Sequence, residues 1–288
     1  VEGIPVPTEH WIGGERIGST DVFADVSPID EQVIAEVARG GPDEVDRAVR
    51  AAREAFAVWG RTDPKRRAEV LHRIADGVEA AVPRLAAVET RDNGSLLRSM
   101  QRSVMPRVAR NFRFFADELL RLGEERRYEG YAERIAWDPA GVEAVITPWN
   151  APLMLATWRF APALAAGNTV VLKPPEWAPL TASLFADIAR EAGLPGGAFN
   201  VVQGIGEEAG AALVAHPDVD RISFTGSVAT GRLVAAAAGA NLTPVSLELG
   251  GKSPLLVFAD ADVEAAVAQA VNQYDNAGQV CLAGTRLL

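Results

Sequence analysis

The sequence predicts an α/β fold built on a mostly parallel five-stranded sheet with helices on both faces. Two observations carry this prediction. Five short apolar runs alternate with stretches of helical periodicity, and these runs lie at 141–148, 168–174, 199–204, 221–226 and 245–251. Strands that alternate with helices form repeated βαβ units, and strands that are apolar throughout are buried on both faces of a sheet.

Residues 1–122 are expected to form short strands followed by helices that belong to the same domain as the sheet. The apolar residues of 42–60 recur on one helical face, and Asp63 and Pro64 favour the start of a second helix. The ends of three helices are indicated by glycines, namely Gly60, Gly94 and Gly123.

The rest of the chain divides into three parts. Residues 123–140 alternate charged and aromatic side chains, which predicts an extended arm or hairpin. An exposed strand of this kind needs a partner, so we expect an oligomer contact there. Residues 141–249 hold the Rossmann-like core. Residues 250–288 contain one strand, one helix and a cysteine stretch, and they are expected to be the truncated beginning of a second α/β domain.

Composition excludes several classes of function. The formal net charge of −10 argues against binding to nucleic acid or to an anionic membrane surface. A single cysteine is typical of a reducing compartment, and we expect a cytoplasmic protein. The three histidines show no spacing suited to a metal, so no metal site is predicted.

Polar residues at the carboxyl ends of the predicted strands should converge on one cleft, as they do in parallel sheets. Asn150 could donate to a developing oxyanion, or it could cap the helix that follows. Glu248 lies in an otherwise apolar strand; it could be a buried general base or a carboxylate satisfied by backbone donors. Cys281 could be a nucleophile or a core thiol.

Two turns could bind phosphate. The stretch 204–210, "GIGEEAG", follows a strand and opens a helix, but it matches the dinucleotide fingerprint poorly. Gly226 and Ser227 are better placed between a strand and a helix. Either stretch could instead be an ordinary tight turn. Lys173 and Glu176 could contact a ribose or form a solvated pair, and a carboxylate at 176 would favour NAD over NADP.

Four motifs occur together and in order: "AVITPWN", "ISFTGSVATGR", "LELGGKSP" and "NAGQVCLAGTR". From about Trp11 to Leu288 the chain resembles the N-terminal three-fifths of the aldehyde dehydrogenase superfamily. It is most similar to the branch that contains hydroxymuconic-semialdehyde and betaine-aldehyde dehydrogenases. The resemblance implies that Cys281 is the nucleophile, Glu248 the general base and Asn150 the oxyanion-hole amide.

The resemblance also implies a small-molecule aldehyde as substrate, NAD as cofactor with NADP possible, and a homodimer or homotetramer in the full-length protein. It assigns these residues to cofactor binding: Ile146, Thr147, Pro148, Trp149, Lys173, Glu176, Gly206, Gly210, Phe224, Thr225, Gly226, Ser227, Gly231 and Leu249. The implied reaction oxidises an aldehyde, such as a semialdehyde of aromatic catabolism, to an acid through a cysteine thiohemiacetal and a thioester. By the same resemblance, residues 250–288 begin the catalytic domain. The alternative is a non-catalytic fragment that at most binds nucleotide.

Overall fold

The computed structural model describes residues 1–121, 124–274, 276 and 278–288. Its centre is a seven-stranded sheet with the strand order β11-β10-β7-β8-β9-β1-β2. The five predicted strands form its parallel part, and these are β7 (Val142–Ile146), β8 (Thr169–Lys173), β9 (Phe199–Val201), β10 (Arg221–Gly226) and β11 (Val245–Leu249). The predicted α/β class and the mostly parallel sheet are therefore confirmed.

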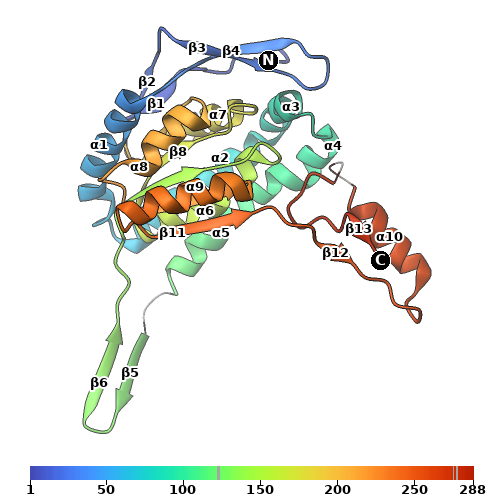
Figure 1. Ribbon diagram of the computed structural model, residues 1–288. Coiled ribbons are helices and arrows are strands. Elements are labelled where there is room, and N and C mark those ends of the chain that lie inside the picture. The colour runs from blue at the N-terminus through green and yellow to red at the C-terminus, as the bar shows by residue number, and fades with distance from the viewer. Residues whose placement is uncertain (122–123, 275, 277) are drawn as a thin grey trace.

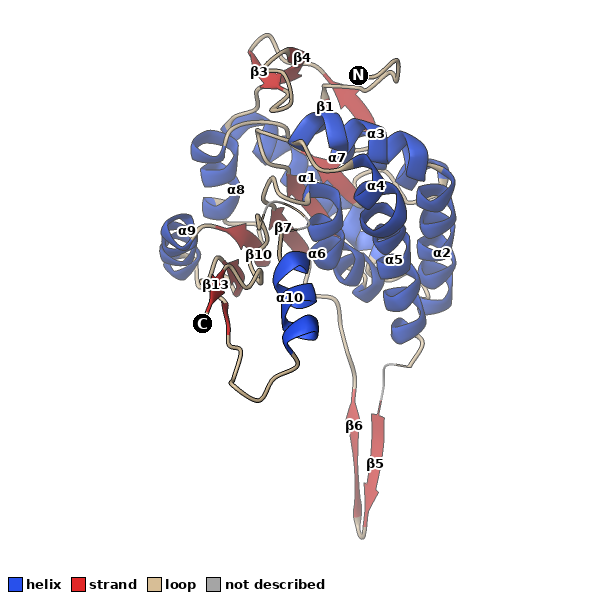
Figure 2. Cartoon of the chain, turned by 90° about the vertical axis from the view of Figure 1, so that its right-hand side faces the viewer, coloured by secondary structure: helices blue, strands red, loops and turns tan. Residues whose placement is uncertain are grey.

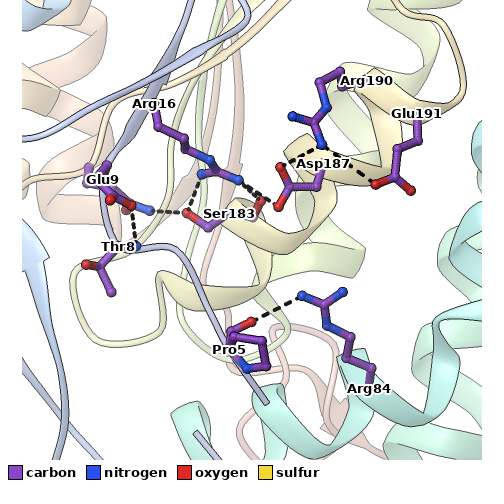
Figure 3. A network of polar contacts seen from close by, with 10 residues as sticks. Pro5, Thr8, Glu9, Arg16, Arg84, Ser183, Asp187, Arg190 and Glu191 are labelled. Carbon is purple, nitrogen blue, oxygen red and sulfur yellow. Dashed lines mark hydrogen bonds and ion pairs between the residues drawn. The ribbon is translucent and has the colours of Figure 1, made fainter.

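The sheet is wider than the five predicted strands because the N-terminus adds a hairpin to it. Strands β1 (His10–Ile12) and β2 (Glu15–Ile17) pair antiparallel, and Trp11 pairs with Val201 of β9. Arg16 ties this hairpin to helix α7 (Leu180–Glu191), as Figure 3 shows. Its guanidinium donates to the Ser183 carbonyl at 2.9 Å, pairs with Asp187 at 3.0 Å and lies 4.9 Å from the Trp11 ring centroid.

Helices cover both faces of the sheet (Figures 1 and 2). One face packs against α1 (Pro42–Trp59), α8 (Ala211–Ala215) and α9 (Val228–Ala240). The other packs against α6 (Pro152–Ala166) and α7. Helices α2 (Pro64–Ala80), α3 (Val82–Asn93) and α5 (Met105–Leu119) pack on these two helices as a further layer. The short α4 (Leu97–Ser99) and the π-helix η1 (Met100–Val104) precede α5, and the π-helix η2 (Gly206–Gly210) precedes α8.

Local sequence signals account for several helix ends. Asp63 caps α2 by accepting from the Lys65 amide at 2.8 Å, as expected, and Pro64 occupies the first helical position. Gly94 ends α3 in the left-handed region, with a φ of 78°. Gly60 follows α1 as expected. Gly123, expected to end the fourth helix, lies outside the described residues, and α5 itself ends at Leu119.

Buried aromatic rings pack together on the side of the sheet where α5, α6 and α7 lie. Phe112, Phe160, Phe185 and Phe199 are buried, and neighbouring ring centroids lie 4.9 to 5.9 Å apart. Each fully buried ring contributes roughly 2–3 kcal/mol by removing apolar surface from water. This cluster joins α6 to α5, α7 and β9, and α6 begins directly after the loop that carries Asn150.

Three smaller pieces stand apart from the sheet (Figure 1). Strands β3 (Val22–Val26) and β4 (Val33–Ala38) form one hairpin. Strands β5 (Glu124–Tyr128) and β6 (Tyr131–Ile135) form another, which projects from the body as an arm. After β11, the chain forms β12 (Pro254–Leu255), α10 (Val263–Asn272) and β13 (Arg286–Leu287), and β12 pairs with β13. The domain boundaries given above remain predictions.

The described residues contain no helix whose length and apolar character suit a membrane span. Within the same residues, His, Cys, Asp and Glu side chains form no cluster of three that could hold a metal ion.

Buried carboxyl groups connect the β3–β4 hairpin to the helices. Burial raises the pKa of Asp25 on β3 to about 6. Burial and the facing charge of Asp25 raise the pKa of Asp92 on α3 well above its usual range. Asp92 also accepts from the Leu180 amide at 3.0 Å, at the start of α7. Among the described residues no donor reaches either carboxylate oxygen of Asp25, so the two acids are best satisfied when they share a proton.

This acid pair predicts a pH-dependent stability. The folded state keeps a proton on the acid pair at pH values above 4, where the unfolded state has already lost it. The contribution of the pair to the free energy of unfolding is therefore complete below pH 4 and is lost as the pH rises through about 6. Asp25→Asn should therefore gain stability over the parent chain as pH rises from 5 to 8, by about 2 kcal/mol at pH 8. Urea unfolding at both pH values measures this difference. Glu36→Gln, an exposed change in the same hairpin, should show no such trend, and a pH-independent difference for Asp25→Asn would contradict the shared proton.

Candidate active site

The candidate site lies at the carboxyl ends of the parallel strands, where the strand order reverses. Successive strands β7, β8 and β9 extend the sheet in one direction, whereas β10 and β11 lie on the other side of β7. Loops after β7 and β10 consequently diverge and leave a crevice, which is where ligands bind in open α/β sheets. The predicted site residues follow β7, β8, β10 and β11, so this edge of the sheet gathers most of them.

Lys173 and Glu176 form a partly buried ion pair after β8. The lysine Nζ lies 2.7 Å from the glutamate Oε2, and their side chains are 3% and 29% exposed. Burial lowers the pKa of Lys173, and the Glu176 charge partly opposes that effect. For Glu176, burial acts to raise the pKa, but the Lys173 charge and hydrogen bonds outweigh it and leave the pKa below its ordinary value. The alternative of a solvated pair is therefore wrong for Lys173.

The glycines of η2 lie beside this pair. A Cβ built on Gly206 would lie 3.8 Å from Glu176 Oε1, and one built on Gly210 would lie 3.8 Å from Lys173 Cδ. Four of the predicted cofactor residues therefore meet at one place, although β8 and η2 are separated by about thirty residues of chain. Residues 206–210 of the stretch 204–210 form the π-helix η2, which agrees with the poor match of the stretch to the dinucleotide fingerprint.

The turn between β10 and α9 supplies the second part of the predicted cofactor site. Ser227 is the N-cap of α9, and its hydroxyl accepts from the Thr230 amide at 3.0 Å. Gly231, one turn into the helix, allows Leu249 of β11 to approach closely, since a Cβ there would lie 2.6 Å from a Leu249 methyl. Phe224 is buried within the cluster that α8 and α9 cover, whereas Thr225 and Gly226 are half-buried.

The end of β7 supplies the third part. Ile146 and Thr147 are buried, and Pro148 and Trp149 are half-buried. The Thr147 amide donates to the carbonyl of Lys173 at 3.4 Å, which continues the β7–β8 ladder beyond the strand. The lysine ammonium and the β7 loop are thereby held at the same edge of the sheet.

Asn150 contacts the segment that leads to the cysteine. Its Nδ2 donates to the Gln279 carbonyl at 2.8 Å. Ala151 is the N-cap residue of α6 and makes no side-chain cap bond, so the helix-cap reading of Asn150 is wrong. A cleft of about 270 Å³ opens beside the asparagine, and it is lined by residues 93–96 together with Trp149, Asn150, Tyr274, Asn276 and Gln279.

Cys281 is an exposed free thiol, so the core-thiol reading is wrong. The Ser253 hydroxyl donates to its carbonyl oxygen at 3.2 Å, which joins the cysteine segment to the loop after β11. Gln279, two residues earlier, receives the Asn150 amide. The segments that carry Cys281, Asn150 and Glu248 are therefore connected through two hydrogen bonds.

Glu248 differs from the expectation of a buried carboxylate. Its side chain is 64% exposed because β11 is the edge strand of the sheet and no described strand pairs with its outer side. The nearest charged group is Arg159 on α6, whose Nη2 lies 3.5 Å from Glu248 Oε1. The alternative was that backbone donors satisfy the Glu248 carboxylate. In the part of the chain that the structure describes, no backbone donor is hydrogen-bonded to it.

Sequence reasoning missed two charged residues on α6 and β7, namely Arg159, which contacts Glu248, and Glu143. Each interrupts an apolar stretch, Arg159 within "LMLATWRFAPALAAG" and Glu143 within "GVEAVITP". A charge inside an apolar element is rare unless it is paired, and this rarity was the signal that could have identified both.

The model of the aldehyde dehydrogenase family matches residues 15–288. The chain belongs to the aldehyde dehydrogenase family. Among its relatives is a 5-carboxymethyl-2-hydroxymuconate semialdehyde dehydrogenase of Escherichia coli, 43% identical over 96% of this chain and 60% of the relative. Another is a 2-hydroxymuconic semialdehyde dehydrogenase of Pseudomonas sp. strain CF600, 44% identical over 97% of this chain and 60% of the relative.

Solved structures of the family have the same fold. An indole-3-acetaldehyde dehydrogenase in complex with NAD+ superimposes with a TM-score of 0.96 at 38% identity, covering 99% of this chain and 60% of that one. The NAD+ complex of an aldehyde dehydrogenase from Bacillus cereus superimposes with a TM-score of 0.94 at 36% identity, covering 97% and 58%. The chain thus spans about 60% of the length of the curated relatives it matches.

The Lys173–Glu176 pair predicts a measurable contribution to stability. Glu176→Gln would leave the 3%-exposed lysine without its counter-charge. We expect a loss of about 2 kcal/mol, less than for a fully buried pair because the glutamate is partly solvated. Urea denaturation measures the change, with the exposed neighbour Glu207→Gln as the matched control. Equal stabilities of the two variants would show that Lys173 does not need the carboxylate.

Proposed function

We propose that the protein oxidises an aldehyde to a carboxylic acid with NAD(P) as the electron acceptor, and that Cys281, Asn150 and Glu248 carry out the chemistry. The observation that carries the proposal is the junction of their three segments. Asn150 Nδ2 reaches the Gln279 carbonyl at 2.8 Å, and Ser253 reaches the Cys281 carbonyl at 3.2 Å. Membership of the aldehyde dehydrogenase family supports the same assignment.

The residues present suit a dinucleotide. A buried ammonium with its carboxylate partner faces the η2 glycines, where added Cβ atoms would meet the pair only at 3.8 Å. The α9 N-terminus adds backbone donors of the kind that hold phosphate. In the proposal, Lys173, Glu176, Gly206 and Gly210 hold the adenosine half, and the turn at Gly226 holds the pyrophosphate. When bound there, NAD(P) supplies the hydride acceptor.

The protein's own residues supply the remaining chemistry. The Cys281 thiolate adds to the aldehyde carbon, and the carbonyl oxygen becomes an oxyanion that the Asn150 amide stabilises. Loss of hydride from the former aldehyde carbon converts this adduct into a thioester. Glu248 then takes a proton from a water molecule that attacks the thioester carbonyl, which releases the acid and restores the Cys281 thiolate.

The proposed substrates are semialdehydes of aromatic breakdown. Relatives at 43% and 44% identity bear the names of hydroxymuconic semialdehyde dehydrogenases. Amide and hydroxyl side chains of Asn93, Ser95 and Asn276 line the cleft beside Asn150, and such groups suit a substrate that carries polar groups away from its aldehyde.

We also propose a cytoplasmic homo-oligomer that the β5–β6 arm helps to assemble. In the described structure these two strands pair only with one another, so both outer edges of the arm are open to strand pairing. The exposed Trp137 follows the arm directly. A second copy of the chain is the proposed partner, and sedimentation of the complete protein tests it.

Cys281→Ser tests the reaction. The variant should lose aldehyde-dependent NADH formation by at least about a hundredfold, because a hydroxyl is a far weaker nucleophile than a thiolate, while its affinity for NAD+ stays within about threefold. Stopped-flow absorbance measures the first property and calorimetry the second, with an aliphatic aldehyde and a hydroxymuconic semialdehyde as substrates. If the unmodified chain bound NAD+ but produced no NADH, this chain would act only as a nucleotide-binding fragment.

Glu176→Gln tests the choice of cofactor. A carboxylate that accepts from the ribose 2′-hydroxyl repels a 2′-phosphate, so the amide should reduce the preference for NAD+ over NADP+ by about threefold to tenfold. The two dissociation constants, measured side by side, give the ratio. Glu207→Gln changes the same charge close by, and it should leave the ratio as it is. An unaltered ratio in Glu176→Gln would mean that this carboxylate does not recognise the 2′ position.

A further inference from the structure

The sheet face on the side of α6 and α7 is apolar at one end and polar at the other. Most of it is apolar. Its β10–β11 end is polar, and the strand register places these residues on that one face: Arg221, Ser223, Thr225, Ser246 and Glu248. The other side of β10, with Ile222 and Phe224, belongs to the apolar cluster that α8 and α9 cover. A sheet face this polar is costly to cover unless its groups are paired.

Glu143 of β7 is the most buried charge on this polar end. Only 5% of the residue is exposed, and the Ser223 hydroxyl donates to its Oε1 at 2.6 Å. Burial raises the pKa of Glu143, and the hydroxyl and the positive charges of Arg221 and Arg159 only partly offset that effect. Arg221, which pairs with Glu143 in the strand register, also donates its Nη2 to the Ser246 hydroxyl at 2.6 Å. Arg159 on α6 is a second positive charge that acts on the buried carboxylate.

Arg159 contacts the carboxylate of Glu248. Its side chain is 18% exposed, and its Nη2 lies 3.5 Å from Glu248 Oε1. No acceptor among the described residues reaches its buried Nε. Glu248 is therefore the carboxylate that the Arg159 guanidinium contacts. At 3.5 Å the contact with Glu248 is a loose ion pair, longer than the 2.7–2.9 Å typical of charge-assisted hydrogen bonds.

We propose that Arg159 is a positioning residue for Glu248. The inference rests on the proposed function, in which Glu248 activates the water that hydrolyses the thioester. An exposed glutamate on an edge strand samples many rotamers, and a fixed positive charge on α6 restricts them to the side that faces α6. At 3.5 Å the pair is loose enough to leave the carboxylate accessible to water.

A purely structural role is the competing explanation. Arg159 would then serve only to compensate Glu143, and its loss would act through stability. The double variant Arg159→Gln/Glu143→Gln separates the two, because it removes the buried carboxylate together with its counter-charge. Arg159→Lys restores the charge without the planar fork. Arg66→Gln, on α2, is the matched control, since it removes an exposed arginine that pairs with the nearby Glu69.

The experiment follows a single turnover of the full chain with NAD+ and an aliphatic aldehyde. Rapid quenching and intact-mass measurement record how the thioester on Cys281 forms and how it disappears. In Arg159→Gln the thioester should form within about twofold of the normal rate but disappear about fivefold to tenfold more slowly, a part of the 10²–10⁴ that a well-placed base contributes. The double variant should regain the melting temperature but not the hydrolysis rate, and Arg159→Lys should regain most of the rate.

Two results would overturn the positioning role while leaving the proposed function intact. One is a normal rate of thioester loss in Arg159→Gln. The other is a double variant that recovers hydrolysis together with stability. An unmodified chain that forms no thioester at all would instead refute the proposed function for this chain, and the positioning role with it.

Discussion

The reversal of strand order at β7 is the constraint on which the rest of the site depends. Because β8 and β10 lie on opposite sides of β7, the loops that follow these strands leave in different directions and a crevice opens between them. Asn150 stands at the end of the central strand, and Lys173 and Gly226 end its two neighbours. The register of the parallel strands brings these three residues to the same edge of the sheet, and no direct contact between them is needed.

The parts of the fold that follow local rules could be predicted from the sequence. The five parallel strands are apolar runs bounded by turn residues. Asp63 caps the start of α2 with its side chain, and Gly94 ends α3 through its left-handed backbone. The attachment of β1 to β9 could not be predicted, because it depends on a single residue pair, Trp11 with Val201, far apart in the sequence. A three-residue strand has too little pattern to identify its partner.

Predictions of the candidate site differ in the same way. The order and spacing of motifs predicted Cys281, Asn150 and Glu248, and the meeting of Lys173 and Glu176 with the η2 glycines is compatible with the predicted cofactor site. Burial was misjudged where it depends on neighbouring elements rather than on the strand itself. Glu248 lies in an apolar stretch of sequence but is exposed, because its exposure depends on what lies next to an edge strand. Arg159 was overlooked because its partner Glu248 lies far away in the sequence.

Leu249 gives the site a mechanical link that its chemistry alone does not suggest. Its methyl group rests against Gly231, where even one added carbon would intrude to 2.6 Å, and its neighbour in the chain is Glu248. The first turn of α9 and the end of β11 are therefore packed directly against each other. A side chain at position 231 would push the Leu249 side chain aside, and Leu249 is the neighbour of the carboxylate at position 248. The packing of a helix that faces the proposed cofactor site is in this way connected to the strand end that carries the proposed base.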